Sequence, residues 1–78
     1  MTDLNQMTDI QELNDIGSEH HENGDTQTAL QYYLRALELC ETSDDPLDRA
    51  KTVTNLGGVY FDLGEKDIAL EHLEEGLA

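Results

Sequence analysis

The sequence predicts an all-α fold of tandem helix-turn-helix hairpins, four helices in all, that stack as a small α-solenoid. Apolar residues recur every three or four positions along most of the chain, whereas no stretch alternates with a period of two over a useful length. The segment 15–30 also resembles the segment 55–70 when the two are aligned at an offset of 40 residues. Because one such hairpin is too small to bury its own apolar face, two similar hairpins in one chain predict stacking.

The first predicted helix begins at Thr8 and ends at Asn23-Gly24. Thr8 and Gln11 have the spacing of a capping box, in which each side chain satisfies a free backbone N–H of the first turn. An Asn-Gly pair after the last periodic residue is a typical helix stop. The apolar face of this helix comprises Ile10, Leu13, Ile16, Gly17 and His20.

The second predicted helix begins after a cap at Asp25 or Thr26. Its apolar face comprises Ala29, Leu30, Tyr33, Ala36, Leu37 and Cys40. The stretch "ETSDDP" then interrupts the helical pattern. Residues 43–45 offer caps, and Pro46 suits the first turn of a new helix, where its missing N–H has no partner to lose.

The third predicted helix ends at Gly64, and its apolar face comprises Leu47, Ala50, Val53, Leu56, Gly57, Tyr60 and Leu63. A fourth helix follows, with an apolar face formed by Ile68, Ala69, Leu73 and Leu77. Residues 1–8 precede the first periodic segment, so we expect a frayed N-terminus there.

Two sets of residues repeat one pattern along the chain. The first set is Leu13, Ile16, Gly17, His20, Gly24, Ala29, Tyr33 and Ala36, and the second is Val53, Leu56, Gly57, Tyr60, Gly64, Ala69, Leu73 and Gly76. This pattern resembles that of tetratricopeptide repeats, in which a large apolar residue, Leu-Gly, an aromatic residue, Ala, a second aromatic residue and a closing Pro follow one another. The resemblance covers residues 10–78.

The resemblance is incomplete at several points. His20 stands in place of an aromatic residue, Glu41 in place of the closing Pro, and Gly76 in place of Ala. The spacing of 40 residues also exceeds the family's usual period of about 34. It is similar to the longer periods of repeats in kinesin light chain and in some bacterial peptide-responsive regulators.

The small residues of the pattern have a mechanical reason. The two helices of a hairpin approach most closely where the side chains are small, and the pattern places there Gly17, Ala29, Gly57 and Ala69. The resemblance implies one domain over residues 1–78, in which repeat one spans 9–42 and repeat two spans 43–78.

The charge of the chain limits its partners. Four Lys and Arg residues oppose 18 Asp and Glu residues, which gives a formal net charge of −14. This charge repels phosphate backbones and anionic lipid surfaces, so we expect no nucleic-acid or membrane partner. The single cysteine, Cys40, and the lack of an apolar N-terminal segment favour a reduced, cytoplasmic location. We favour a solvated surface or a host with a salty interior as the reason for the acidity over a specific basic partner.

No residue cluster in the sequence favours catalysis or a metal. In "EHHE", residues 19–22, adjacent side chains point about 100° apart on a helix, and no His has another His or Cys three or four positions away. There is no nucleophile elbow, phosphate-binding loop or pair of carboxylates in a pocket. We expect no cofactor, no metal and no enzymatic activity. Cys40 is interpreted as a small core residue.

In proteins of this resemblance, the first helix of each hairpin lines a groove that holds a peptide or helix of another protein. The groove residues predicted from the helical period are Gln11, Asn14, Asp15, Ser18, His21, Glu22, Lys51, Thr54, Asn55, Gly58, Phe61 and Asp62. The amides of Asn14 and Asn55 suit hydrogen bonds to a peptide backbone, and Phe61 suits an apolar anchor. The carboxylates favour a neutral or basic ligand. They oppose the C-terminal carboxylate that chaperone-binding family members clamp.

The sequence therefore predicts a non-catalytic protein-interaction module. Two alternatives remain open: a structural self-association unit or the N-terminal piece of a longer solenoid, and an acidic mimic of nucleic acid that blocks a basic protein. The apolar face of the fourth helix has no following helix to cover it, so we also expect a homo-oligomer, formed as a dimer through that helix.

Overall fold

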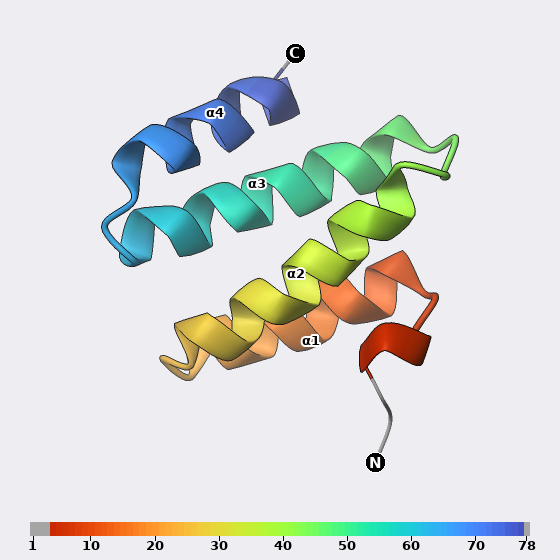
Figure 1. The fold of residues 1–78 in the computed structure, drawn as a ribbon, viewed down its shortest axis with the longest axis horizontal. Helices are drawn as coiled ribbons and strands as arrows, with labels where there is room; N and C mark the ends of the chain where they lie inside the picture. The colour runs from red at the N-terminus through yellow and green to blue at the C-terminus, as the bar shows by residue number, and fades with distance from the viewer. Residues whose placement is uncertain (1–3, 78) are drawn as a thin grey trace.

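A computed structural model describes residues 4–77 of the chain (Figure 1). Its elements are a short 3-10 helix and four α-helices, in the order η1 Leu4–Gln6, α1 Ile10–Glu22, α2 Thr26–Cys40, α3 Pro46–Asp62 and α4 Lys66–Leu77. No strand occurs among the described residues. The predicted all-α class and its four helices in two hairpins are confirmed. Within residues 4–77, no helix has the length and apolar character needed to cross a membrane.

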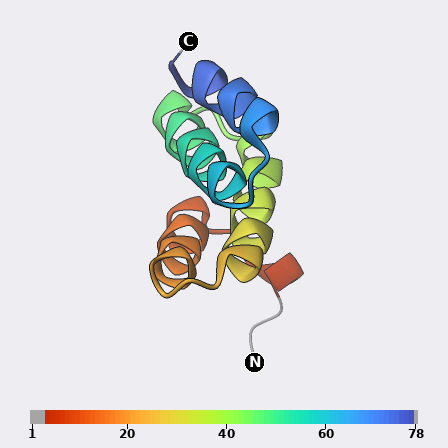
Figure 2. The same ribbon diagram turned by 90° about the vertical axis from the view of Figure 1, so that its left-hand side faces the viewer.

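The helices form two thin layers. Figure 2 shows α1 and α3 on one side of the molecule and α2 and α4 on the other. Within each hairpin, α1 packs along α2 and α3 packs along α4, while α3 also contacts both helices of the first hairpin. The molecule therefore measures only 32 × 30 × 15 Å, so most side chains lie close to solvent.

Each hairpin closes over a glycine, as predicted. A Cβ atom built on Gly17 would lie 2.6 Å from Cε1 of Tyr33, and one built on Gly57 would lie 2.7 Å from Cγ of Leu73. Ala29 and Ala69 are also buried, and the carbonyl oxygen of Ala69 faces Gly57. Because real Cβ contacts are longer than these distances, only glycine allows the helices to approach this closely.

Both hairpin turns have the same geometry. Gly24 and Gly64 each have a φ of +83°, in the left-handed region that glycine adopts without strain. The backbone N–H of Asp25 donates to the carbonyl of His20, and the N–H of Glu65 donates to the carbonyl of Tyr60, each at 2.8 Å. These contacts form a Schellman motif. The predicted helix stops at Gly24 and Gly64 are confirmed.

The predicted cap of α1 is wrong by one residue. Asp9, in an extended conformation, is the N-cap, and its carboxylate accepts a hydrogen bond from the backbone N–H of Glu12 at 3.2 Å. Thr8 is exposed and precedes the helix. An aspartate caps as well as a threonine does, so spacing alone did not distinguish the two. At α3, Asp45 is the N-cap and Pro46 is the first helical residue, as predicted.

The N-terminal residues are more ordered than the sequence indicated. Helix η1 packs on α2, Met7 is buried, and the Nε of Arg35 donates to the carbonyl oxygen of Met7 at 3.2 Å. The expectation of a frayed segment is therefore wrong for residues 4–7, because Leu4 and Met7 complete an apolar cluster on the first hairpin. Residues 1–3 lie outside the described residues.

Two residues assigned to the core are exposed. Leu47 is 71% exposed and Ile68 is 37% exposed. Leu47 is in the first turn of α3, where it shares a helix side with the exposed Thr54, seven residues later. The sequence pattern assigned both residues to an apolar face but did not predict their exposure. The side chain of Leu77 lies outside the described residues.

Candidate functional site

The predicted groove residues all belong to α1 and α3, whose outer side is called the α1/α3 face below. Figure 2 shows these two helices side by side, and they contact each other directly. The exposed members of the predicted set are Gln11, Asp15, Glu22, Lys51, Thr54, Phe61 and Asp62. The half-buried members are Ser18, His21, Asn55 and Gly58. The residues of the predicted set therefore differ in their access to a ligand.

Asn14 is the clearest correction to the predicted groove. Its side chain is buried, at 1% exposure, between the two hairpins. Its Nδ2 donates to Oγ1 of Thr52 at 2.9 Å, and its Oδ1 accepts from Nδ2 of Asn55 at 3.1 Å. Because α1 packs on α3 at this point, Asn14 has no free surface for a peptide. Both amides are used to join the hairpins.

Thr52 is at the centre of this buried polar contact. Besides accepting from Asn14, its Oγ1 accepts from Sγ of Cys40 at 3.6 Å and donates to the backbone carbonyl of Asp48 at 2.8 Å. Cys40 is buried there, as the sequence predicted. One hydroxyl thus connects α1, α2 and α3, and the sequence analysis did not identify it.

A second contact between the hairpins lies at the other end of α1. Nε2 of His21 contacts the carboxylate Oδ2 of Asp62. A Cβ atom built on Gly58 would lie 3.7 Å from Cε1 of His21, which is an ordinary contact distance. These three residues belong to the predicted groove, and they join α1 to α3. The imidazole of His21 and the carboxylate of Asp62 therefore each use part of their hydrogen-bonding capacity on the other.

His20 has a different role from its neighbour His21. Its ring stacks on Tyr32 with a centroid distance of 5.5 Å, and its Nδ1 lies 3.4 Å from Oδ2 of Asp25. The second hairpin has the matching stack between Tyr60 and His72, at 5.4 Å. His20 thus packs at the seam of its hairpin, as predicted. In the part of the chain that the structure describes, no three His, Cys, Asp or Glu residues are grouped so that they could hold a metal ion.

Ser18 and Glu22 belong to the predicted groove, and both also affect the buried Tyr33. Burial raises the pKa of the Tyr33 hydroxyl from its ordinary value of 10.0, while a hydrogen bond with Ser18 lowers this pKa and the carboxylate of Glu22 raises it. Ser18 therefore interacts within its own hairpin. This leaves less of its hydroxyl available to a ligand than the helical period alone suggested.

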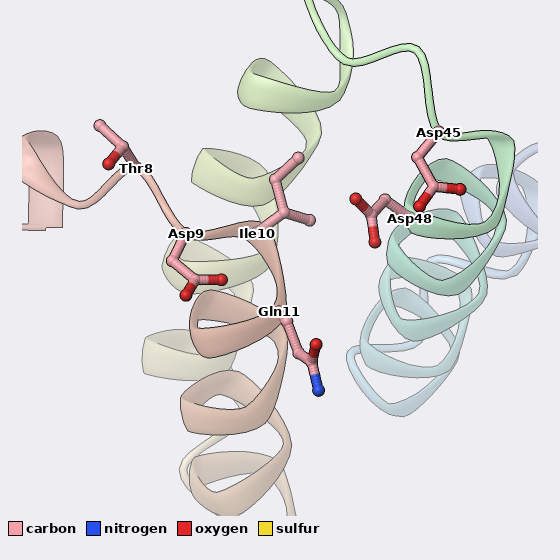
Figure 3. A pocket seen from close by; sticks show the side chains of 6 residues that line it. All are labelled: Thr8, Asp9, Ile10, Gln11, Asp45 and Asp48. Atoms are coloured by element: carbon pink, nitrogen blue, oxygen red, sulfur yellow. The ribbon is translucent and has the colours of Figure 1, made fainter.

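An open acidic hollow lies between the N-terminal ends of α1 and α3. Its volume is about 540 Å³, and it is lined by Thr8, Asp9, Ile10, Gln11, Asp45 and Asp48. Figure 3 shows Asp45 and Asp48 on one side of this hollow and Ile10 and Gln11 on the other. The three carboxylates belong to segments far apart in the sequence, which the fold brings together.

A second hollow, more apolar, lies on the outer side of α3. Its volume is about 390 Å³, and it is lined by Leu47, Ala50, Lys51, Thr54 and Asn55. The hydroxyl of Thr54 donates to the backbone carbonyl of Ala50 at 2.8 Å, so its hydrogen-bonding capacity is partly used. Lys51 is the only cationic residue among the described residues that line either hollow.

Sequence reasoning missed Asp45, Asp48 and Leu47 as members of this face. The predicted groove began at Lys51 on the third helix. Extending the same helical stripe by one turn toward the N-terminus reaches Leu47 and Asp48, which precede Lys51 by four and three residues. The signal was therefore present in the helical period, but Leu47 had been assigned to the core.

Comparison with known proteins agrees with this geometry. A family model described as tetratricopeptide repeat matches residues 9–78. The chain is 36% identical over 55 residues to the Photosystem I assembly protein Ycf3 of Prochlorococcus marinus strains MIT 9301 and MIT 9215, and 34% identical to that of strain MIT 9312. Each match covers 70% of this chain and 30% of the relative, so the chain spans less than a third of the length of these relatives. No solved structure gives a significant match.

Proposed function

Because this chain belongs to the tetratricopeptide repeat family, we propose that it is a non-catalytic interaction module that binds a neutral or basic segment of a partner protein along the α1/α3 face. The relatives are named as assembly proteins, which supports a protein partner. The repeat boundaries at 42/43, the cytoplasmic location and self-association through α4 remain predictions of the sequence.

The observation that carries this proposal is the placement of the acidic hollow beside the apolar one. Asp48 is in the first turn of α3, next in sequence to Leu47, which lines the apolar hollow. A ligand crossing α3 would therefore meet a carboxylate and an exposed leucine within one helical turn. Lys51 is the cationic residue that lines the apolar hollow.

The chemistry of the two hollows indicates the chemistry of the ligand. Asp9 and Asp45 each accept one backbone N–H as helix caps, but a carboxylate has about four acceptor sites. Both can therefore still accept from a Lys or Arg side chain, together with Asp48. An apolar ligand side chain would rest against Leu47 and Ala50. The ligand is thus a segment with a basic residue next to an apolar one.

The experiment is fluorescence anisotropy with labelled peptides of one length that alternate Lys with Leu, Gln with Leu, or Glu with Leu. We expect the Lys peptide to bind most tightly. Asp48→Asn should weaken its binding about fivefold, which corresponds to about 1 kcal/mol. The matched control is Asp67→Asn, which removes the same charge from the first turn of α4 and should leave binding unchanged.

This comparison also separates the proposal from the acidic mimic of nucleic acid. A mimic acts through total charge, so it would lose the same affinity in Asp48→Asn and Asp67→Asn. Equal losses would therefore contradict a binding site on the α1/α3 face. Tightest binding of the Glu peptide would contradict the proposed ligand charge.

The apolar part of the site is tested by Leu47→Ala. Removing an apolar anchor commonly costs about 2 kcal/mol of binding, so we expect the Lys peptide to bind at least about tenfold more weakly. Leu34→Ala is the matched control, because Leu34 is an exposed leucine on α2, in the other layer. A larger loss of affinity in Leu34→Ala than in Leu47→Ala would place the apolar contact on the α2 and α4 layer and contradict the proposal.

A further inference from the structure

The turn between α1 and α2 contains a reactive pair of residues, Asn23 and Gly24. This turn lies at an edge of the molecule (Figure 1), and both residues are exposed. Neither lines a hollow described above. Among the asparagines of the sequence, Asn23 is the one that is followed by glycine. The pair therefore places a side-chain amide next to a backbone nitrogen that no neighbouring Cβ shields.

An asparagine followed by glycine readily loses its side-chain amide. The backbone nitrogen of the glycine gives its proton to hydroxide and attacks Cγ of the asparagine, which closes a succinimide ring. The bond between Cγ and Nδ2 breaks, and Nδ2 takes a proton from water and leaves as ammonia. Water then opens the ring at either carbonyl, which gives aspartate or isoaspartate. Glycine favours the attack because it has no side chain to crowd the ring.

The native turn holds the attacking nitrogen in a hydrogen bond. The N–H of Gly24 donates to the carbonyl oxygen of His21 at 3.1 Å, and the N–H of Asp25 donates to that of His20 at 2.8 Å. The reaction therefore requires the turn to open. A Cβ atom built on Gly24 would meet nothing within 4 Å. Because so little packs around Gly24, the turn can open without unfolding the hairpin.

The asparagines in the middle of α1 and α3 lack these features. Asn14 is buried and its amide bonds to Thr52 and Asn55, while Nδ2 of Asn55 donates to Asn14. Both lie inside helices, and the residues after them are Asp15 and Leu56, which carry side chains. The folded chain therefore restrains both amides away from the ring-forming geometry.

We propose that Asn23 is a site of spontaneous deamidation, at a rate set by the opening of the hydrogen bond between Gly24 and His21. Its product is a modified first hairpin with an additional carboxylate in the turn. The only reagents are water and hydroxide, so the modification needs no enzyme.

This modification should loosen the last turn of α1. The new carboxylate would stand at the C-terminal end of the helix, where the dipole is negative, between Glu22 and Asp25. Isoaspartate also adds a carbon to the backbone, which shifts the N–H groups that bond to the carbonyls of the helix end. His21, which contacts Asp62 of α3, belongs to this last turn. The modification therefore acts beside a contact between the two hairpins.

The test incubates the 78-residue chain in mildly alkaline buffer. Tandem mass spectrometry of tryptic fragments locates the exchange of ammonia for water, and isoaspartate methyltransferase identifies isoaspartate. We expect conversion at Asn23 and none at Asn14 or Asn55. A free peptide with the sequence of residues 19–28 should react faster than the folded chain. The ratio of the two rates should be similar to the protection of the Gly24 amide against hydrogen exchange, because both report the same opening.

Two variants separate the reaction from its consequence. Asn23→Gln keeps the amide but would have to form a larger ring, so it should stop the conversion. Asn23→Asp supplies the product carboxylate directly and should melt about 2 °C or more below Asn23→Gln.

Three results would overturn the proposal. The first is no conversion at Asn23 over a time that the measured hydrogen exchange makes sufficient. The second is a rate in the folded chain equal to that of the free peptide, because the turn would then not control the reaction. The third is conversion at Asn14 or Asn55 as fast as at Asn23. Equal melting temperatures of Asn23→Asp and Asn23→Gln would contradict the loosening of the turn by the new charge.

Discussion

The Thr52 hydroxyl makes three hydrogen bonds, two of which connect the two hairpins. It accepts from Asn14 and Cys40 and donates to the carbonyl of Asp48. The side chains of Asn14 and Thr52 are both buried. A buried donor left without an acceptor costs the full penalty of its lost hydration. Thr52 is therefore one of the side chains that fix the relative position of the hairpins, together with the contact between His21 and Asp62.

We predict that Thr52→Val lowers the free energy of unfolding by about 1–3 kcal/mol, because Nδ2 of Asn14 loses its acceptor inside the protein. The matched control is Thr54→Val, two residues later on α3, whose hydroxyl also donates to the carbonyl four residues before it. That exposed substitution should change the free energy of unfolding by less than about 0.5 kcal/mol. Urea unfolding followed by circular dichroism measures both. Equal effects would show that the contact does not join the hairpins.

The sequence alone could not assign Asn14 at the residue scale. Its helical position indicates which side of α1 it occupies, but not that the second hairpin covers that side. Its hydrogen-bond partner Thr52 is 38 residues away in sequence, and no periodicity shows which neighbour covers a given side of a helix. The same reason explains the misplaced Leu47, whose exposure is set by the first turn of α3.

At the scale of elements, two adjacent glycines in α3 serve opposite purposes. Gly57 is buried where α3 meets α4, and a Cβ there would also lie 3.3 Å from the carbonyl oxygen of Ala69. Gly58, the next residue, is half-buried and leaves room for a Cβ. The sequence predicted the first of these roles from the repeat pattern. The sequence did not predict the free space beside Gly58, because residue type alone does not show which atoms surround a glycine.

We predict opposite effects for alanine at these two positions. Gly57→Ala should lower the free energy of unfolding, because overpacking costs about 1–3 kcal/mol and exceeds the gain in helix propensity of about 1 kcal/mol or less. Gly58→Ala should raise it by about 0.5–1 kcal/mol, because only the propensity gain applies. Denaturant unfolding of the two variants distinguishes them. Stabilisation by both substitutions would mean that Leu73 moves aside freely at the seam.

At the scale of the whole molecule, the charge is large for the size of the protein. The formal net charge of −14 lies within dimensions of 32 × 30 × 15 Å. The screening length is about 30 Å at 0.01 M salt and about 8 Å at 0.15 M. At low salt, every carboxylate therefore repels the others across the molecule, including Asp9, Asp45 and Asp48 around the acidic hollow.

We predict that the melting temperature rises when NaCl is increased from about 0.01 M to about 0.15 M, because screening weakens this repulsion in the compact state. Glu71→Lys on the exposed side of α4 should raise the melting temperature at low salt and reduce its dependence on salt. Differential scanning calorimetry at the two salt concentrations measures both effects. An unchanged or lower melting temperature at the higher salt would count against repulsion as the dominant electrostatic effect.

The sequence predicted the whole molecule unevenly. The hairpins, their turns and their close seams follow from local patterns, because apolar period, glycines and small residues act within about 20 residues of one another. The acidic hollow does not, because Gln11 and Asp48 come from different hairpins and meet only after α1 docks on α3. Its location therefore required the structure.

The central claim, that the α1/α3 face is the binding surface, is tested most directly by nuclear magnetic resonance. The 15N-labelled chain is titrated with the Lys and Leu peptide, and the change in each backbone amide shift is recorded. The largest changes should fall at Gln11, Asp48, Lys51 and Thr54, while Gln31 on α2 and Glu71 on α4 should stay unchanged. Changes centred on α2 and α4, or spread evenly over all exposed carboxylates, would contradict the claim.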